Sequence, residues 1–230
     1  MRTTFQQRLD GLEAKLGQMG QVLRSQLDRT LTALATADAD VADEVIRRDR
    51  LLDADYVEVE EEILRTLALE APVAKDLRLV AGVLHVNSHI ERMGDLCVNM
   101  ARFVKLAGRD QPDPEIQSTL AEMGEHARRM LDTALECFTN RDVELAERLP
   151  IMDQPLDELN ERVFRQLENL PAERGTTTPG PWASRMVLAA RYLERIGDHS
   201  VDIGEQVVFI VTGEVRELVP PKAVRAQLER

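Results

Sequence analysis

Hydrophobic residues recur at intervals of three and four along most of the chain, a spacing that predicts long amphipathic helices. The stretch from about residue 3 to 37 carries Leu9, Leu12, Leu16, Met19 and Leu23 in this pattern. Prolines and glycines separate the periodic segments and mark their junctions. We therefore expect six helices, with boundaries good to a few residues. They cover about 3–37, 39–70, 75–108, 114–139, 142–170 and 181–212.

Two prolines interrupt the pattern of the expected fifth helix. Pro150 and Pro155 both fall inside it. A proline in a helix interior removes a backbone hydrogen bond and costs about 3 kcal/mol. We therefore expect this helix to kink or restart near Asp153, whose side chain would serve as an N-cap.

The second half of the chain repeats the first. A shift of 104 residues superposes Asp49 on Asp153 and Asp53 on Asp157, and a shift of 103 superposes the sequence ERMGD at 91–95 on ERIGD at 194–198. Such self-similarity indicates a duplicated structural unit. With short connections between helices, the fold class is all-α, a tandem repeat of two antiparallel three-helix bundles. The expected domains are a first repeat at 1–109, a second at 110–215 and a C-terminal tail at 216–230.

Composition and charge agree with a helical protein and exclude a nucleic-acid binder. Aromatic residues make up only 3% of the chain, which argues against a β-sandwich or β-barrel. The 29 basic residues are outnumbered by 41 acidic ones, for a net charge of −12. A nucleic-acid binder needs a concentrated basic face, and no run of Lys or Arg supplies one. Such acidity suits cations or a basic partner surface.

The chain has features of a cytoplasmic protein. Cys97 and Cys137 lie inside helical patterns and form no CxxC motif, as expected in a reducing compartment. The N-terminal residues show no hydrophobic signal core. Because no apolar stretch approaches the roughly 18 residues needed to span a bilayer, membrane insertion is not expected.

The most informative polar residues are paired carboxylates. Each repeat carries a DxxxD on its second helix and an ExxxD on its third, and residues four apart share one helical face. Like charges at this spacing repel unless a cation lies between them. Two pairs on adjacent helices would form an oxygen-rich site suited to Mg²⁺, Mn²⁺, Fe or Ca²⁺. The candidate metal ligands are Asp49, Asp53, Glu91, Asp95, Asp153, Asp157, Glu194 and Asp198.

A solvated polar face is the simpler interpretation of any one pair, but the repetition in both halves favours metal binding. Gly94 and Gly197 add weight, because each stands mid-helix beside the carboxylates at a cost of roughly 1 kcal/mol relative to alanine. We expect a neighbouring helix or a ligand to approach the backbone closely at both glycines. Tight helix packing without a ligand is the alternative.

The four histidines give little support to an enzyme. None has a Glu three residues before it, so the ExxH motifs of a ferritin-like diiron oxidase are missing. His85 and His89 are four apart and could bind metal, although ordinary packing is the simpler expectation. A histidine phosphotransfer module and a metal-free helical adaptor remain alternatives. Neither a P-loop nor a nucleophilic triad is found, and we expect no enzymatic activity.

The two ERxGD motifs, each preceded by a DxxxD, together with PVAKDLR at 72–78, resemble the PhoU family of phosphate-signalling regulators. The likeness extends over about residues 3–212. The second repeat departs from it by reading PGPWASR where the first has the DLR signature, and Pro155 stands within the second DxxxD.

The resemblance implies several properties. It implies metal clusters on the surface of each repeat, held by the eight carboxylates named above, with divalent or trivalent Mg, Mn, Fe or Zn as the ions. It also implies a negative regulator of phosphate uptake and phosphate-starvation signalling. The implied partners are the ATPase subunit of a phosphate ABC transporter and a sensor histidine kinase, and the implied assembly is a homodimer.

Overall fold

The computed structural model describes residues 2–106, 113–169 and 181–220, and within these ranges it contains helices and no strands. The all-α prediction is confirmed. The expected ends of two helices, at 107–108 and 170, and residues 221–230 of the expected tail lie outside the described residues. The helices are α1 (Arg2–Thr36), α2 (Ala39–Glu70), α3 (Ala74–Leu106), α4 (Pro114–Asn140), α5 (Val143–Ala146), α6 (Leu149–Glu168) and α7 (Pro181–Thr212).

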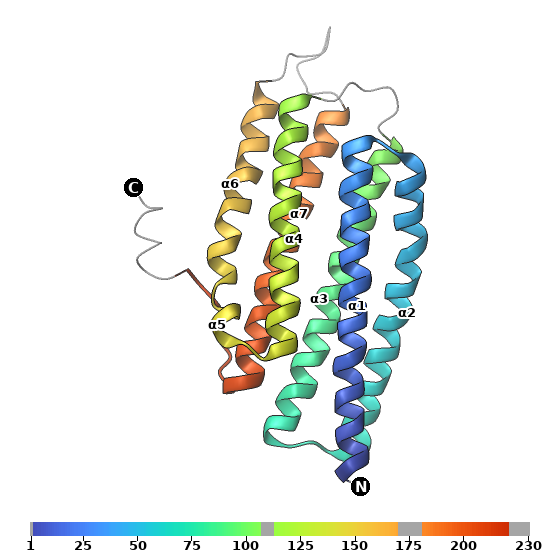
Figure 1. The fold of residues 1–230 in the computed structure, drawn as a ribbon, viewed down its shortest axis with the longest axis vertical. Helices are drawn as coiled ribbons and strands as arrows, with labels where there is room; N and C mark the ends of the chain where they lie inside the picture. The colour runs from blue at the N-terminus through green and yellow to red at the C-terminus, as the bar shows by residue number, and fades with distance from the viewer. Residues whose placement is uncertain (1, 107–112, 170–180, 221–230) are drawn as a thin grey trace.

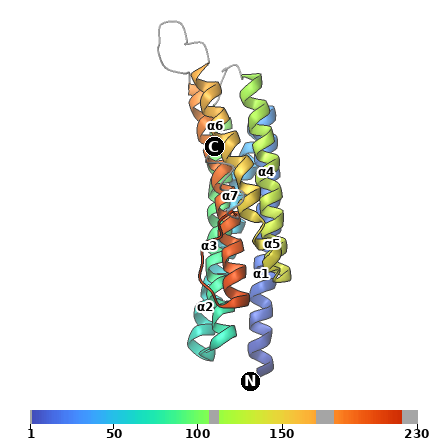
Figure 2. The same cartoon turned by 90° about the vertical axis from the view of Figure 1, so that its left-hand side faces the viewer.

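The long helices form two antiparallel bundles that stand side by side in an elongated molecule (Figure 1). The first bundle contains α1, α2 and α3, and the second contains α4, α6 and α7. In the turned view the two bundles remain aligned along the same long axis (Figure 2). Helix α2 packs on α1 and α3, and α6 packs on α4 and α7. These two helices therefore lie at opposite outer edges of the molecule.

Matching aspartates begin helices in the two repeats. The side chain of Asp38 accepts hydrogen bonds from the backbone N–H groups of Asp40 and Val41 at the start of α2. Its counterpart in the second repeat, Asp142, accepts from the backbone N–H of Leu145 at the start of α5. Such side chains satisfy N–H groups that have no partner within the helix.

The repeats join through two reciprocal contacts between α1 and α4. A Cβ on Gly20 would stand 2.7 Å from Leu135 Cδ2, and a Cβ on Gly124 would collide with the side chain of Leu31. Each leucine therefore packs on the glycine of the opposite repeat, and both contacts depend on a missing side chain. The internal duplication of the sequence thus appears as a pseudo-twofold relation between the bundles.

Helices α3 and α7 form the centre of the molecule. They pack on each other, and each also contacts the other two long helices of its own bundle. Residues on most sides of both helices are consequently buried, among them Met93, Cys97, Ile196 and Ile203. Some polar residues of these helices are buried as well, among them Asn87 on α3 and Ser200 on α7.

The restart expected in the second repeat occurs earlier in the chain than predicted. Helix α5 ends at Ala146 and α6 begins at Leu149, so Asp153 lies inside α6 and is not an N-cap. The break falls where Pro150 enters the first turn of α6, a position in which the missing N–H costs nothing. Helix α6 continues through Pro155.

No helix among the described residues is long and apolar enough to cross a membrane. After α7, residues 213–220 run back along the second bundle without helical structure. Leu218 is buried there, and its backbone N–H donates a 2.8 Å hydrogen bond to the Glu205 carboxylate. The described part of the expected tail is therefore packed on α7.

Candidate metal centres

The four carboxylates predicted in the first repeat meet where α2 packs on α3. Asp49 is half-buried and Asp53 is exposed on α2, while Glu91 is half-buried and Asp95 is exposed on α3. Burial raises the pKa of Asp49, and the charges of Asp53 and Asp95 raise it further. Burial also raises the pKa of Glu91, with Asp95 and Asp53 adding to it. The four groups therefore form one electrostatically coupled set.

The second repeat brings its four carboxylates together in the same way, between α6 and α7. Burial, followed by the charge of Asp157, raises the pKa of Asp153 to about 7. Burial, followed by the charge of Asp198, raises the pKa of Glu194 to about 7. Pro155 therefore does not separate Asp153 and Asp157 from the carboxylates of α7.

Glu194 is more deeply placed than the polar-face interpretation of the sequence suggests, since only 8% of it is exposed. Its Oε2 atom and the Oδ1 atom of Asp153 are both buried, and neither has a hydrogen-bond partner among the described residues. Leaving a buried acceptor unsatisfied is costly. A cation held by the second cluster would satisfy both oxygens. No three of these carboxylates bring ligand oxygens within 4.8 Å of one another among the described residues, so their side chains would have to close around the ion.

The mid-helix glycines make room for the aspartates. A Cβ on Gly197 would stand 2.5 Å from Asp153 Oδ1, and a Cβ on Gly94 would stand 3.3 Å from Asp49 Oδ1 and collide with Leu52. The expected close approach at both glycines is confirmed. The approaching group is in each case the first aspartate of the DxxxD together with a leucine.

Three neighbours of the clusters were not predicted from the sequence. Gln26 Nε2 donates a 2.8 Å hydrogen bond to Asp49 Oδ1 in the first repeat. Met130 occupies the corresponding place in the second repeat, with its sulfur 3.4 Å from a Cβ on Gly197, and it offers no donor to Asp153. Arg191 contacts Glu194 one turn away on α7. The duplication is thus exact in its carboxylates but not in the groups around them.

The histidines pair differently from the sequence expectation. His85 is exposed, whereas His89 lies against His199 of α7, with 3.2 Å between their Nδ1 atoms. Burial lowers the pKa of His89 to about 4. No linear motif signals this pairing, because it depends on how α3 packs on α7.

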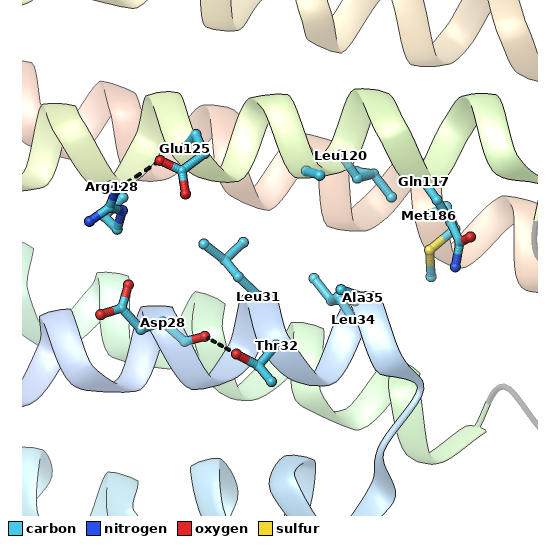
Figure 3. Close-up of a pocket in the computed structure, with 11 residues that line it drawn as sticks. Asp28, Leu31, Thr32, Leu34, Ala35, Gln117, Leu120, Glu125, Arg128 and Met186 are labelled. Atoms are coloured by element: carbon cyan, nitrogen blue, oxygen red, sulfur yellow. Dashed lines mark hydrogen bonds and ion pairs between the residues drawn. The ribbon is translucent and has the colours of Figure 1, made fainter.

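A separate pocket of about 480 Å³ lies between α1 and α4. Figure 3 shows Leu31 of α1 pointing toward α4 in this pocket, with the Glu125–Arg128 ion pair at its edge. None of the eight carboxylates lines it. The pocket therefore belongs to the junction of the repeats and not to the candidate metal centres.

Comparisons with known proteins agree with this architecture. The family model for the PhoU domain matches the chain twice, at residues 16–104 and 120–207. The phosphate-specific transport system accessory protein PhoU homolog 1 of Mycobacterium tuberculosis is 32% identical over 214 residues, covering 93% of this chain and 95% of that protein. The PhoU homolog of Clostridium acetobutylicum is 28% identical over 219 residues, covering 94% and 98%.

Solved structures show the same fold. The crystal structure of the phosphate transport system regulatory protein PhoU from Streptococcus pneumoniae has a TM-score of 0.84 and 27% identity, covering 93% of this chain and 100% of that one. PhoU from Pseudomonas aeruginosa has a TM-score of 0.83 and 27% identity, covering 91% and 100%. With two family-model matches and the likeness of sequence and fold over nearly its whole length, this chain belongs to the PhoU family, whose members are accessory and regulatory proteins and not enzymes.

Proposed function

We propose that the chain is a metal-binding cytoplasmic regulator of phosphate uptake and phosphate-starvation signalling. It acts as a negative regulator by docking onto the ATPase subunit of a phosphate ABC transporter, onto a sensor histidine kinase, or onto both. The phosphate role follows from the relatives, which are named accessory proteins of the phosphate-specific transport system. The metal role follows from the chain's own carboxylates.

The observation that carries the metal proposal is the matched pair of carboxylate clusters. Each cluster joins the outer helix of its bundle to a central helix, and the burial of its carboxylates disfavours their charged form. A divalent or trivalent ion, drawn from Mg, Mn, Fe or Zn, would offset much of the negative charge of each cluster. It would also fasten α2 to α3 and α6 to α7, since an ion that binds the folded state stabilises it. The eight ligands are those named from the sequence.

The outer helices supply the docking surfaces in this proposal. Leu51 and Leu64 on α2 are 59% and 60% exposed, and Phe164 on α6 is 45% exposed. These apolar side chains stand on the same helices as the carboxylates. The ions would rigidify the two surfaces and reduce their negative charge, so that metal loading and docking become linked.

Binding of the purified full chain to each partner tests the docking proposal. The ATPase subunit and the cytoplasmic part of the sensor kinase would be immobilised, and retention would be measured with metal-loaded and chelator-treated protein. We expect the metal-loaded chain to be retained more strongly. The double variant Asp53→Asn/Asp95→Asn should bind as weakly as the stripped protein, while the matched control Glu61→Gln, an exposed carboxylate on α2 outside the cluster, should bind normally. Equal retention of all four samples would refute the link between metal and docking.

A homodimer is the assembly we propose, with the exposed leucines of α2 as its contact surface, which leaves α6 with Phe164 as the surface that docks on a partner in the dimer. Light scattering coupled to size-exclusion chromatography measures the mass directly. The wild type should elute as a dimer and Leu51→Glu/Leu64→Glu should elute as a monomer. A monomeric wild type at micromolar concentration would refute this part of the proposal.

A further inference from the structure

Three potential metal ligands converge where the central helices of the two repeats cross. The Nδ1 atoms of His89 on α3 and His199 on α7 lie 3.2 Å apart. Oδ2 of Asp202, one turn further along α7, lies 3.1 Å from His199 Nδ1 and 3.4 Å from His89 Nδ1. Among the residues that the structure describes, only this group brings three such ligand atoms within 4.8 Å of one another.

The three separations match the edges of a metal coordination shell. Zinc holds imidazole nitrogen and carboxylate oxygen at about 2.0–2.2 Å in a tetrahedral arrangement, which places neighbouring ligands about 3.3–3.6 Å apart. The observed 3.1, 3.2 and 3.4 Å need only small side-chain shifts to reach that spacing. A cation at the centre of the triangle, slightly out of its plane, would contact all three atoms.

Hydrogen bonding satisfies only part of the group, because a proton on His199 Nδ1 can donate to Asp202 Oδ2 but leaves the lone pair of His89 Nδ1 facing that oxygen across 3.4 Å. Both histidines turn the same atom, Nδ1, toward one carboxylate oxygen and toward each other. If each neutral ring carried its proton on Nδ1, two N–H groups would face each other across 3.2 Å. A ring that carries no proton there presents a lone pair instead. One cation accepts a lone pair from all three atoms at once.

We propose that His89, His199 and Asp202 form a third metal site, separate in chemistry from the carboxylate clusters, that binds a divalent transition ion of the Zn²⁺ type. Two imidazoles and one carboxylate favour such ions over Mg²⁺ and Ca²⁺, which prefer oxygen ligands. The Asp202 side chain is 40% exposed, and this leaves solvent access for a fourth ligand. Three protein ligands with a fourth position open to water or another ligand are typical of catalytic zinc sites.

The surroundings favour a cation although one arginine is near. Arg92 acts on both His89 and Asp202 with its positive charge. Asp153 and Asp198 are also close enough to interact electrostatically with Asp202, and their negative charges offset the positive charge of Arg92. The site therefore adjoins the second carboxylate cluster and shares its negative field.

The duplication does not produce a second copy of this site. The positions related to His199 and Asp202 in the first repeat are Leu96 and Asn99, and the position related to His89 in the second repeat is Tyr192. Tyr192 stacks on Phe103, with ring centroids 5.7 Å apart. One end of the α3–α7 contact is thus closed by aromatic packing, and the other carries the histidines. A metal there would tie one repeat to the other.

Cobalt(II) binding to the full-length, metal-stripped chain tests the proposal, because tetrahedral Co²⁺ with nitrogen ligands absorbs strongly in the visible range and octahedral Co²⁺ in carboxylate sites does not. We expect one equivalent of the strongly absorbing species, displaced by Zn²⁺. His89→Ala and Asp202→Asn should each weaken its binding by about 100-fold or more, since second-shell losses alone cost 10–100-fold. His85→Ala, an exposed histidine one turn away on α3, is the matched control and should bind as the wild type does.

Two further measurements keep the test decisive. Asp202→Asn preserves shape at a half-exposed position, and thermal unfolding of the stripped variants shows whether they fold. Zn²⁺ should raise the unfolding midpoint of the wild type more than that of Asp202→Asn, in which only the carboxylate clusters could still bind it. Asp157→Asn/Asp198→Asn, which alters the adjoining second cluster, should retain the tetrahedral signal, and this separates the site from the proposed carboxylate centres. Absence of the tetrahedral spectrum from the wild type, or its persistence in folded His89→Ala and Asp202→Asn, would overturn the proposal.

Discussion

Asp153 Oδ1 lies 2.5 Å from the point where a Cβ on Gly197 would stand. The Asp49–Gly94 pair repeats this relationship in the first bundle, with a corresponding separation of 3.3 Å. The glycine on the central helix thus creates the space that the aspartate of the outer helix fills. Both candidate metal centres are built on this pairing.

Substituting the glycines tests whether the space is needed. Gly197→Ala should be less stable than the wild type by about 1–3 kcal/mol, because the added methyl displaces Asp153 and Leu156. It should also lower metal binding by the second cluster. Thermal or denaturant unfolding and metal analysis measure the two effects.

Gly17→Ala is the matched control for this prediction. Gly17 is an exposed helical glycine on α1, and a Cβ there would meet nothing within 4 Å. Its replacement should stabilise the protein by up to about 1 kcal/mol through helix propensity alone. Equal behaviour of Gly17→Ala and Gly197→Ala would show that the close approach has no energetic consequence.

The exchange of Gln26 and Met130 tests the asymmetry between the clusters. Asp49 accepts a hydrogen bond from Gln26, and this bond lowers its pKa, whereas Asp153 has no such donor and its pKa is about 7. A donor to the charged form of a carboxylate favours that form. Met130→Gln should therefore lower the pKa of Asp153, and Gln26→Met should raise that of Asp49. Carboxyl NMR titration of the metal-free protein measures both, and an unchanged Asp153 in folded Met130→Gln would contradict the assignment.

The stability of the metal-free protein should fall as the pH rises from about 6 to 8. Asp153 and Glu194 have pKa values of about 7 in the folded chain, above their ordinary values of 3.8 and 4.5. In this window the folded state binds more protons than the unfolded state, so the free energy of unfolding decreases with pH. His89, whose pKa is lowered to about 4, acts in the opposite direction mainly below pH 6.5.

Denaturant unfolding at several pH values measures this dependence. Glu194→Gln should flatten the decrease, and Glu158→Gln, an exposed carboxylate on α6 outside the cluster, should leave it unchanged. Each kcal/mol corresponds to about 2–4 °C in the unfolding midpoint of a domain of this size. A stability that rises between pH 6 and 8 in the stripped protein would rule out raised pKa values at these two carboxylates.

The helices and the duplication were predictable because both depend on local patterns. Leucine spacing identified the long helices, and the repeated ERxGD identified the equivalent positions of Gly94 and Gly197. The restart of the second repeat was placed wrongly near Asp153. An N-cap residue was available there, but the helix begins at Leu149 with Pro150 in its first turn, where the missing N–H costs nothing, and it continues through Pro155.

The residues that form the candidate sites, and their burial, were only partly predictable. Four carboxylates per repeat could be assigned to adjacent helices from their spacing. The burial of Glu194 could not, since it depends on how closely α6 covers α7. The contact between His89 and His199 joins residues 110 positions apart on different repeats, and only the packing of α3 on α7 brings them together.

The metal content of the full chain, purified without chelators, tests the central claim most directly. We predict bound metal in the wild type, loss of part of it in Asp53→Asn/Asp95→Asn and of another part in Asp157→Asn/Asp198→Asn, and wild-type content in Glu61→Gln and Glu158→Gln. If the wild type binds no metal, or if both double variants retain its full content, the two carboxylate clusters are not metal centres.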